Sequence, residues 1–141
     1  MRVKLTDIAG IIRSKNSGPY ELTMDIMFKT REWYERVRDA GAINEDVVCR
    51  LYRITPDKII NIVHFEPANA IKITIVRPIC SGNLGETDVY GAQQHAPLPV
   101  RPLRKVGQVD RQHGQHARRY ERDYSLYKGD QILHVAPFHR A

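Results

Sequence analysis

The most regular alternation of apolar and polar residues lies in the run YELTMDIMF, from Tyr20 to Phe28. Every second residue from Tyr20 onward is large and apolar, whereas three of the four residues between them are polar. A period of two sends successive side chains to opposite faces of an extended chain. The run therefore predicts a β-strand with one buried face.

The preceding segment, KLTDIAGIIRSKN, spaces its apolar residues as a short amphipathic helix does. The apolar positions are Leu5, Ile8, Ile11 and Ile12. Thr6 stands where an N-cap is expected, and the glycine and proline of NSGP interrupt the pattern. We predict a short helix followed by a turn.

Two further short helices are expected in the middle of the chain. TREWYERVRDAG begins with Thr30 as a cap and ends at Gly41, a residue type that favours a left-handed helix end. NEDVVCRLYRI begins with Asn44 as a cap, and two acids follow in the first turn, where the helix dipole favours negative charge. TPDKII then starts another turn, with Pro56 in the favoured first position.

Two runs rich in β-branched residues, NIVHF and AIKITIVRP, come next and are separated only by EPAN. Such runs predict neighbouring antiparallel strands with a tight connection. After Pro78, three glycines and the absence of an apolar period predict a loop. This order of elements predicts an α+β fold, a small two-layer sandwich of short helices on a mainly antiparallel sheet.

Composition sets the size of the folded unit. Of the 141 residues, 42% are apolar, which is enough for a hydrophobic core. Residues 1–98 hold the elements described above, whereas residues 99–141 are rich in Arg, Gln and His and have few apolar residues before QILHVAPF. We predict an α+β domain at 1–98 and a basic, weakly structured extension at 99–141.

The net charge of +6 arises almost wholly in that extension. Up to Pro97 the chain has 13 basic and 12 acidic residues, and beyond it 9 basic and 4 acidic residues. A basic arm supports weak, salt-sensitive binding to phosphate backbones, but the near-neutral domain adds no nucleic-acid-binding motif. We therefore do not expect nucleic acid as a main partner, and this role ranks third among those considered.

Other features bear on compartment and cofactors. Cys49 and Cys80 have no metal-ligand spacing, and the N-terminus lacks the apolar stretch of a secretory signal, so we expect a cytoplasmic protein. No window approaches the roughly 20 apolar residues that cross a bilayer, so no membrane partner is expected. His113 and His116 are separated by a glycine-containing stretch without a further ligand, so we expect no metal and no cofactor.

Candidate chemistry concentrates in TDVYGAQQHAP. This segment contains an acid, a phenol, two carboxamides and an imidazole: Asp88, Tyr90, Gln93, Gln94 and His95. Such a set can orient a polar ligand and move a proton. It equally fits a polar loop in which Asp88 caps a turn, Tyr90 packs and the amides face water. Both interpretations stay open.

A second polar concentration, RSKNSGPYE, precedes the predicted strand. It places Arg13, Lys15 and Asn16 just before Gly18. Cationic side chains beside a glycine turn suit a carboxylate or a phosphate. The spacing matches neither a Walker loop nor a dinucleotide fingerprint, and a solvated basic turn explains it equally well.

Three stretches, taken in order and spacing, carry a resemblance to a known family: LTDIAGIIRSKNSGPYELTMDIMF, NIVHFEPANAIKITIVRP and GETDVYGAQQHAPL. They resemble a bacterial domain-of-unknown-function family met beside, or fused to the end of, the acyclic terpene utilisation protein AtuA. The resemblance covers residues 1–98 and places the family's characteristic asparagine and glycine on Asn16 and Gly18. It implies that the two polar segments face one site, that an AtuA-like larger protein is the partner, and that carboxylates or acyl-CoA-like metabolites are the substrates.

Two hypotheses follow from these observations. In the first, the chain is an accessory subunit that takes part in a hydratase or lyase step, with acid–base or orienting contacts from Asp88, Tyr90 and His95. The substrate-binding residues in this hypothesis are Arg13, Lys15, Asn16 and Gly18 at an anionic group, with Gln93 and Gln94 as hydrogen-bonding groups. In the second, the chain is a non-catalytic binding or scaffolding subunit whose polar segments dock onto the larger protein.

Overall fold

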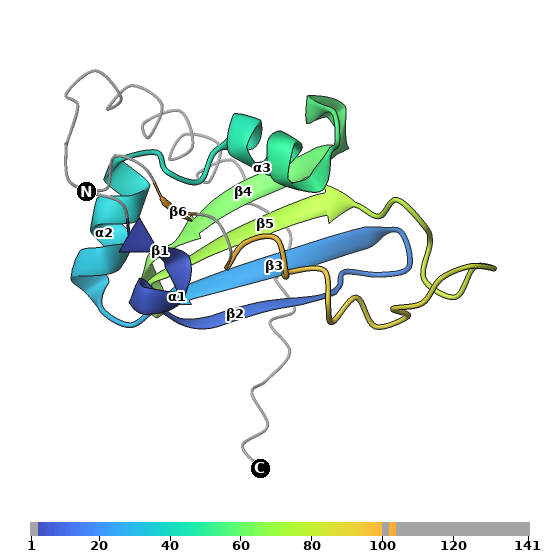
Figure 1. Ribbon diagram of the computed structural model, residues 1–141, viewed down its shortest axis with the longest axis horizontal. Helices are drawn as coiled ribbons and strands as arrows, with labels where there is room; N and C mark the ends of the chain where they lie inside the picture. The colour runs from blue at the N-terminus through green and yellow to red at the C-terminus, as the bar shows by residue number, and fades with distance from the viewer. Residues whose placement is uncertain (1–2, 100–101, 104–141) are drawn as a thin grey trace, which may run out of the picture.

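A four-stranded antiparallel sheet forms the centre of the computed structural model, which describes residues 3–99 and 102–103 (Figure 1). Its spatial order is β2-β3-β5-β4. The strands are β2 (Ala9–Asn16), β3 (Glu21–Phe28), β4 (Ile59–Phe65) and β5 (Ala70–Val76). The three strands predicted from alternation and β-branched content are confirmed as β3, β4 and β5, and the short connection between the last two contains the 3₁₀ turn η2 (Glu66–Ala68).

The pleat of β3 gives the sheet one apolar face. Four alternate residues of this strand are buried: Leu22, Met24, Ile26 and Phe28. The register continues the face onto the next strand, where Ile73 lies opposite Met24. Tyr20, the first residue of the predicted alternation, lies just before the strand and is exposed.

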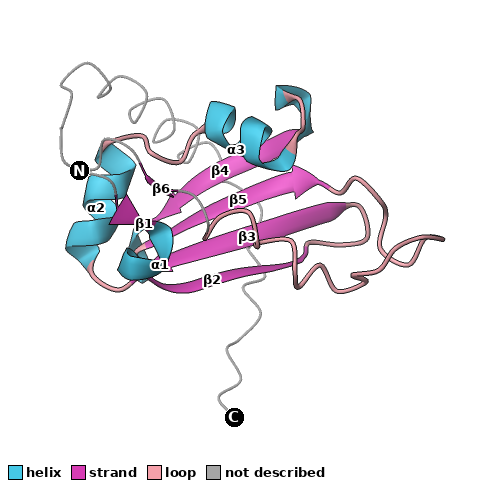
Figure 2. Ribbon diagram, in the orientation of Figure 1, coloured by secondary structure: helices cyan, strands magenta, loops and turns pink. Residues whose placement is uncertain are grey.

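Three helices cover this apolar face (Figure 2). They are α1 (Leu5–Ile8), α2 (Arg31–Asp39) and α3 (Glu45–Tyr52). Tyr34 and Val37 of α2 and Val48 of α3 are fully buried in the same core as the sheet residues. The predicted α+β class, with short helices on an antiparallel sheet, is confirmed.

The two middle helices begin at their predicted caps. The Thr30 Oγ1 accepts the backbone N–H of Trp33 at 3.3 Å, and the Asn44 Oδ1 accepts that of Val47 at 3.0 Å. Gly41 follows α2 with a φ of +54°, in the left-handed region that the helix end requires. The turn expected at Pro56 is the 3₁₀ helix η1 (Pro56–Lys58).

The helix predicted from KLTDIAGIIRSKN is wrong beyond its first turn. Only α1 is helical, its N-cap is Lys4 rather than Thr6, and the chain then continues as β2. Glycine and β-branched residues at GII weaken a helix, while pairing with β3 satisfies the backbone of an extended chain. The apolar spacing fitted both structures, and the sheet decides between them.

The two ends of the described chain meet beside the main sheet. Strand β1 (Val3–Lys4) pairs antiparallel with β6 (Pro102–Leu103). Leu98 and Leu103 are each buried in the core, so packing continues past the predicted domain boundary at residue 98. Residues 104–141, which include the HGQH histidines, lie outside the described residues, and the boundary stays a prediction.

Neither a membrane-spanning helix nor a metal-binding cluster is found in the part of the chain that the structure describes. Within it, no helix has the length and apolar character needed to cross a membrane. The same residues contain no group of three His, Cys, Asp or Glu side chains placed to hold a metal ion. Cys49 and Cys80 are both free thiols and half-buried.

Candidate functional site

The alternation of β2 separates the residues predicted to hold an anion. Arg13 lies opposite Asp25, on the face that no described helix covers, whereas Asn16 lies opposite Leu22 on the apolar face. Lys15 shares the face of Arg13 and is exposed. Arg13 donates to the carboxylate of Asp25 at 2.9 Å. Arg13 and Lys15 therefore do not form one anion-binding site with Asn16.

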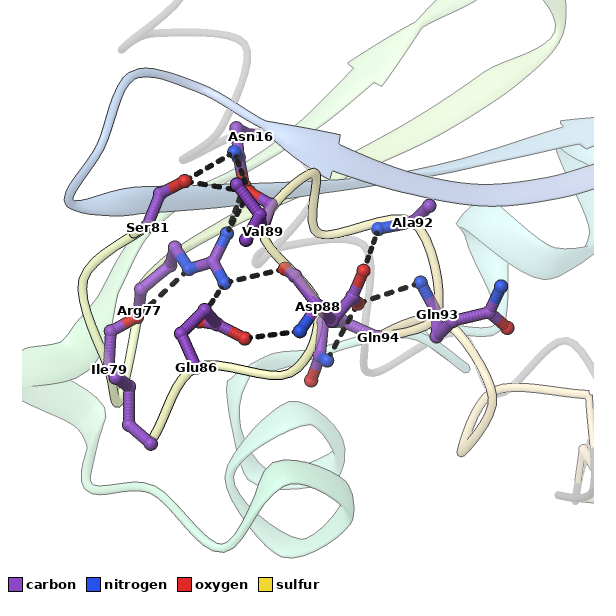
Figure 3. Close-up of polar contacts among 10 residues, drawn as sticks. All are labelled: Asn16, Arg77, Ile79, Ser81, Glu86, Asp88, Val89, Ala92, Gln93 and Gln94. Atoms are coloured by element: carbon purple, nitrogen blue, oxygen red, sulfur yellow. Dashed lines mark hydrogen bonds and ion pairs between the residues drawn. The ribbon is translucent and has the colours of Figure 1, made fainter. Parts of the chain in front are cut away.

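Asn16 lies instead beside the loop that follows β5, residues 77–98. Its backbone N–H donates to the Tyr90 carbonyl at 3.1 Å. Its Nδ2 donates to the Val89 carbonyl at 2.6 Å and to the Ser81 Oγ at 3.2 Å (Figure 3). Gly18 takes a φ of +79° in the turn that follows β2. The structure thus brings Asn16 and the TDVYGAQQHAP segment together; that they face one ligand site, as the resemblance implies, stays a prediction.

Arg77 occupies the middle of this loop. Its side chain is only 3% exposed and donates to the carbonyls of Ile79 and Asp88, each at 3.0 Å. The guanidinium also donates to the Asn16 Oδ1 and forms an ion pair with the Glu86 carboxylate (Figure 3). We name these three residues, Arg77, Glu86 and Asn16, the loop staple, because one buried cation joins β2, the end of β5 and the loop.

Arg77 and Glu86 are not among the site residues predicted from the sequence. The glutamate is only 8% exposed in its side chain, and its Oε1 accepts the backbone N–H of Asp88 at 2.6 Å. That N–H is the main cause of a lowered Glu86 pKa, with the Arg77 hydrogen bond and charge adding to it. The sequence does contain a pattern that could have indicated this buried ion pair: Arg77 comes directly after the apolar run of β5, and Glu86 follows in a glycine-containing loop.

Asp88 organises the second half of the loop. Its carboxylate accepts the backbone N–H groups of Ala92 and Gln93 at 3.0 and 2.9 Å and the side-chain amide of Gln94 at 2.9 Å (Figure 3). The Gln94 amide is the largest cause of a lowered Asp88 pKa, followed by the Gln93 N–H. A carboxylate held ionised by three donors is a weak proton acceptor.

His95 also makes contacts within the chain. Its backbone N–H donates to the Ser14 Oγ at 3.1 Å, and its ring Nδ1 lies 3.0 Å from the Ala92 carbonyl. Because a carbonyl only accepts, the proton belongs on Nδ1, and Nε2 is the acceptor of the neutral ring. Tyr90 differs from these residues, since it is 81% exposed.

The β2–β3 turn and the loop project together from one end of the sheet (Figure 1). The backbone N–H of Arg77 donates to the Tyr20 carbonyl at 2.8 Å and that of Ser81 to the Pro19 carbonyl at 2.9 Å, so the turn and the loop are joined. The exposed large apolar residues there, which we name the loop-end patch, are Tyr20, Ile79, Leu84, Val89 and Tyr90. Exposed large apolar side chains on a turn and a loop that are joined to each other make this end a candidate interaction surface.

The lowered pKa values of Glu86 and Asp88 predict acid sensitivity. A depressed folded-state pKa contributes stability above the unfolded value, here near 4.5 for Glu86 and 3.8 for Asp88, and the contribution is lost as the pH falls through the folded value. We expect the free energy of unfolding to decline below about pH 5 in urea titrations. The Glu86→Gln, Asp88→Asn double variant should decline less steeply; an identical slope would contradict the assignment.

A family model described as Domain of unknown function (DUF4387) matches residues 5–100. No curated protein and no solved structure matches the chain.

Proposed function

The chain belongs to the DUF4387 family, a domain of unknown function, and from this premise we propose that it is a non-catalytic accessory subunit that docks its loop-end patch onto a larger protein. One observation carries the proposal. Glu86 and Asp88 of the loop are engaged in hydrogen bonds within the chain, while its large apolar side chains Leu84 and Val89 are exposed. A catalytic loop needs the opposite arrangement, with polar groups directed toward a ligand.

The internal hydrogen bonds of Asn16 and Asp88 support docking over catalysis. Asp88 receives three hydrogen bonds from its own loop, and Asn16 is bound to Arg77 and Val89. Breaking these contacts to bind a substrate would expose the buried charges of the staple, which is costly. Leu84, in contrast, is fully exposed and has no role in the fold.

The partner we propose is the AtuA-like protein that the motif resemblance names. In this proposal the larger bacterial protein binds the carboxylate or acyl-CoA-like metabolite in a catabolic pathway. This chain docks onto the surface of that protein and completes the assembly. A neutral, apolar docking patch suits a lasting complex, because burial of apolar area is the main favourable contribution to such interfaces.

The experiment is a binding measurement between the full chain and the purified AtuA-like protein by calorimetry. Leu84→Asp removes a side chain worth about 10- to 100-fold in affinity when buried, and adds a charge at the interface. Ile11→Asp is the matched control, since Ile11 is an exposed aliphatic residue on β2, outside the patch. Failure of the wild-type chain to bind, or equal losses in both variants, would contradict the proposal.

The second candidate function is a direct catalytic role for this chain in a hydratase or lyase step. The exposed phenol of Tyr90 favours this role. In a complex this hydroxyl could reach the partner's substrate as an acid or an orienting group. Tyr90→Phe separates the two candidates because it keeps the ring and removes the hydroxyl. Docking alone predicts unchanged turnover by the assembled pair, whereas a catalytic share predicts a fall in kcat without loss of the complex.

A further inference from the structure

Leu84 is the most exposed member of the loop-end patch. Its relative exposure is 103%, against 81% for Tyr90 and 65% for Tyr20. The loop that carries it reaches farther from the sheet than the β2–β3 turn does (Figure 1). Single exposed leucines are common on protein surfaces, so the backbone around this one decides what it can do.

Two consecutive β-turns place Leu84 at a corner of the chain. The first, residues 80–83, is closed by a backbone hydrogen bond of 3.1 Å from the N–H of its last residue to the carbonyl of its first. The second, residues 83–86, is closed in the same way at 3.0 Å. Gly82 and Gly85 occupy the third positions with φ values of +84° and +86°, as type II turns require. Leu84 is the second residue of the second turn.

Both ends of this double turn are attached to the rest of the fold. At one end the Ser81 N–H donates to the Pro19 carbonyl at 2.9 Å, and the Ser81 Oγ donates to a carbonyl within the loop at 2.7 Å. At the other end Glu86 is the buried carboxylate of the loop staple and pairs with Arg77. The backbone that carries Leu84 is therefore anchored on both sides.

The neighbours of Leu84 leave space around it. Gly82 and Gly85 have no side chains, and a Cβ at either position would meet no atom within 4 Å. A surface that meets this tip can therefore approach the backbone beside the leucine and enclose its side chain. Bulky neighbours would instead hold that surface away and allow only a flat contact.

We infer that Leu84 is the anchor residue of the docking proposed above, and that the larger protein carries an aliphatic pocket shaped for one leucine side chain. The inference rests on the proposed function and adds the chemistry of the complementary site. Protein interfaces draw much of their affinity from a few side chains that fill well-packed pockets. An exposed leucine on an anchored tip without bulky neighbours has the shape that such a pocket accepts.

The test is a series of substitutions at Leu84 in the full chain, with the dissociation constant for the purified AtuA-like protein measured by calorimetry. Leu84→Ala should raise this constant by about 10- to 100-fold, because the pocket is left partly empty. Leu84→Trp should also raise it, by about 5- to 150-fold, because an indole overfills a pocket shaped for leucine. On a flat apolar surface Leu84→Trp would instead bind more tightly than the wild type, since it buries a larger apolar area.

Ile11→Trp is the matched control, because Ile11 is an exposed aliphatic residue on β2, outside the patch. Its dissociation constant should equal that of the wild type. Because the Leu84 side chain buries no surface in the free chain, the variants at this position should unfold at the wild-type urea midpoint. A change in binding then reports the interface rather than the fold.

Three results would overturn the inference. Wild-type binding with Leu84→Ala equally tight would show that another residue is the anchor. Wild-type binding with Leu84→Trp equally tight or tighter would exclude the pocket and leave docking in place. A wild-type chain that does not bind overturns the docking itself, and the anchor with it.

Discussion

Replacing Arg77 with methionine is expected to lower the free energy of unfolding by about 3–5 kcal/mol, measured by urea denaturation at neutral pH. The substitution keeps an unbranched apolar stem but removes the cation that pairs with Glu86. It also leaves the carbonyls of Ile79 and Asp88 without their guanidinium donor. Removing one partner of a buried ion pair costs more than the pair is worth, because the other charge stays desolvated.

The control for this prediction is Arg31→Met. Arg31 forms an exposed i,i+4 pair with Glu35 at 2.7 Å, and such exposed pairs contribute little to the free energy of unfolding. The Arg77→Met, Glu86→Gln double variant should recover part of the lost stability, since the unpaired carboxylate is gone. An Arg77→Met variant as stable as Arg31→Met would show that the loop staple does not support the fold.

Replacing Gly91 with alanine is expected to cost about 2–5 kcal/mol in the free energy of unfolding. Two effects add. Gly91 has a φ of +65°, a left-handed conformation that destabilises an L-residue by about 1–2 kcal/mol. A Cβ there would also lie 2.6 Å from both the Asn16 Oδ1 and the Leu22 Cδ1, an overlap that costs about 1–3 kcal/mol as those groups move.

Gly85→Ala separates the two effects. Gly85 has a φ of +86°, yet a Cβ at that position would meet no atom within 4 Å. It should therefore cost only the backbone penalty of about 1–2 kcal/mol. Equal losses in the Gly91 and Gly85 variants, compared by urea denaturation, would mean that the contact between Gly91 and Asn16 does not hold the loop.

The sequence predicted the elements whose signals are local. Strand β3 is visible because its period of two has few exceptions, and α2 and α3 are visible because Thr30 and Asn44 are strong caps. The segment before β3 misled because its isoleucines fit a helical stripe as well as a strand. Pairing with β3 is a contact between distant residues, and a local pattern does not contain it.

The same limit applies to the candidate site. Asn16 and the TDVYGAQQHAP segment were linked only through the family resemblance, because nothing local in either segment refers to the other. Arg13 and Lys15 were grouped with Asn16 because all three precede the glycine turn; the extended conformation of this segment sends neighbours to opposite faces. Arg77 and Glu86 are separated by nine positions in sequence, and only the folded loop shows that they form a buried pair.

The loop staple has a consequence for the thermodynamics of association. A surface loop normally loses conformational entropy when a partner fixes it, and that loss subtracts from affinity. Here Arg77 donates to Asn16 of β2 and to the Asp88 carbonyl of the loop in the folded chain. The loop is therefore already ordered before a partner binds. The apolar side chains on its outer side are thereby preorganised, and their burial can contribute almost undiminished to binding.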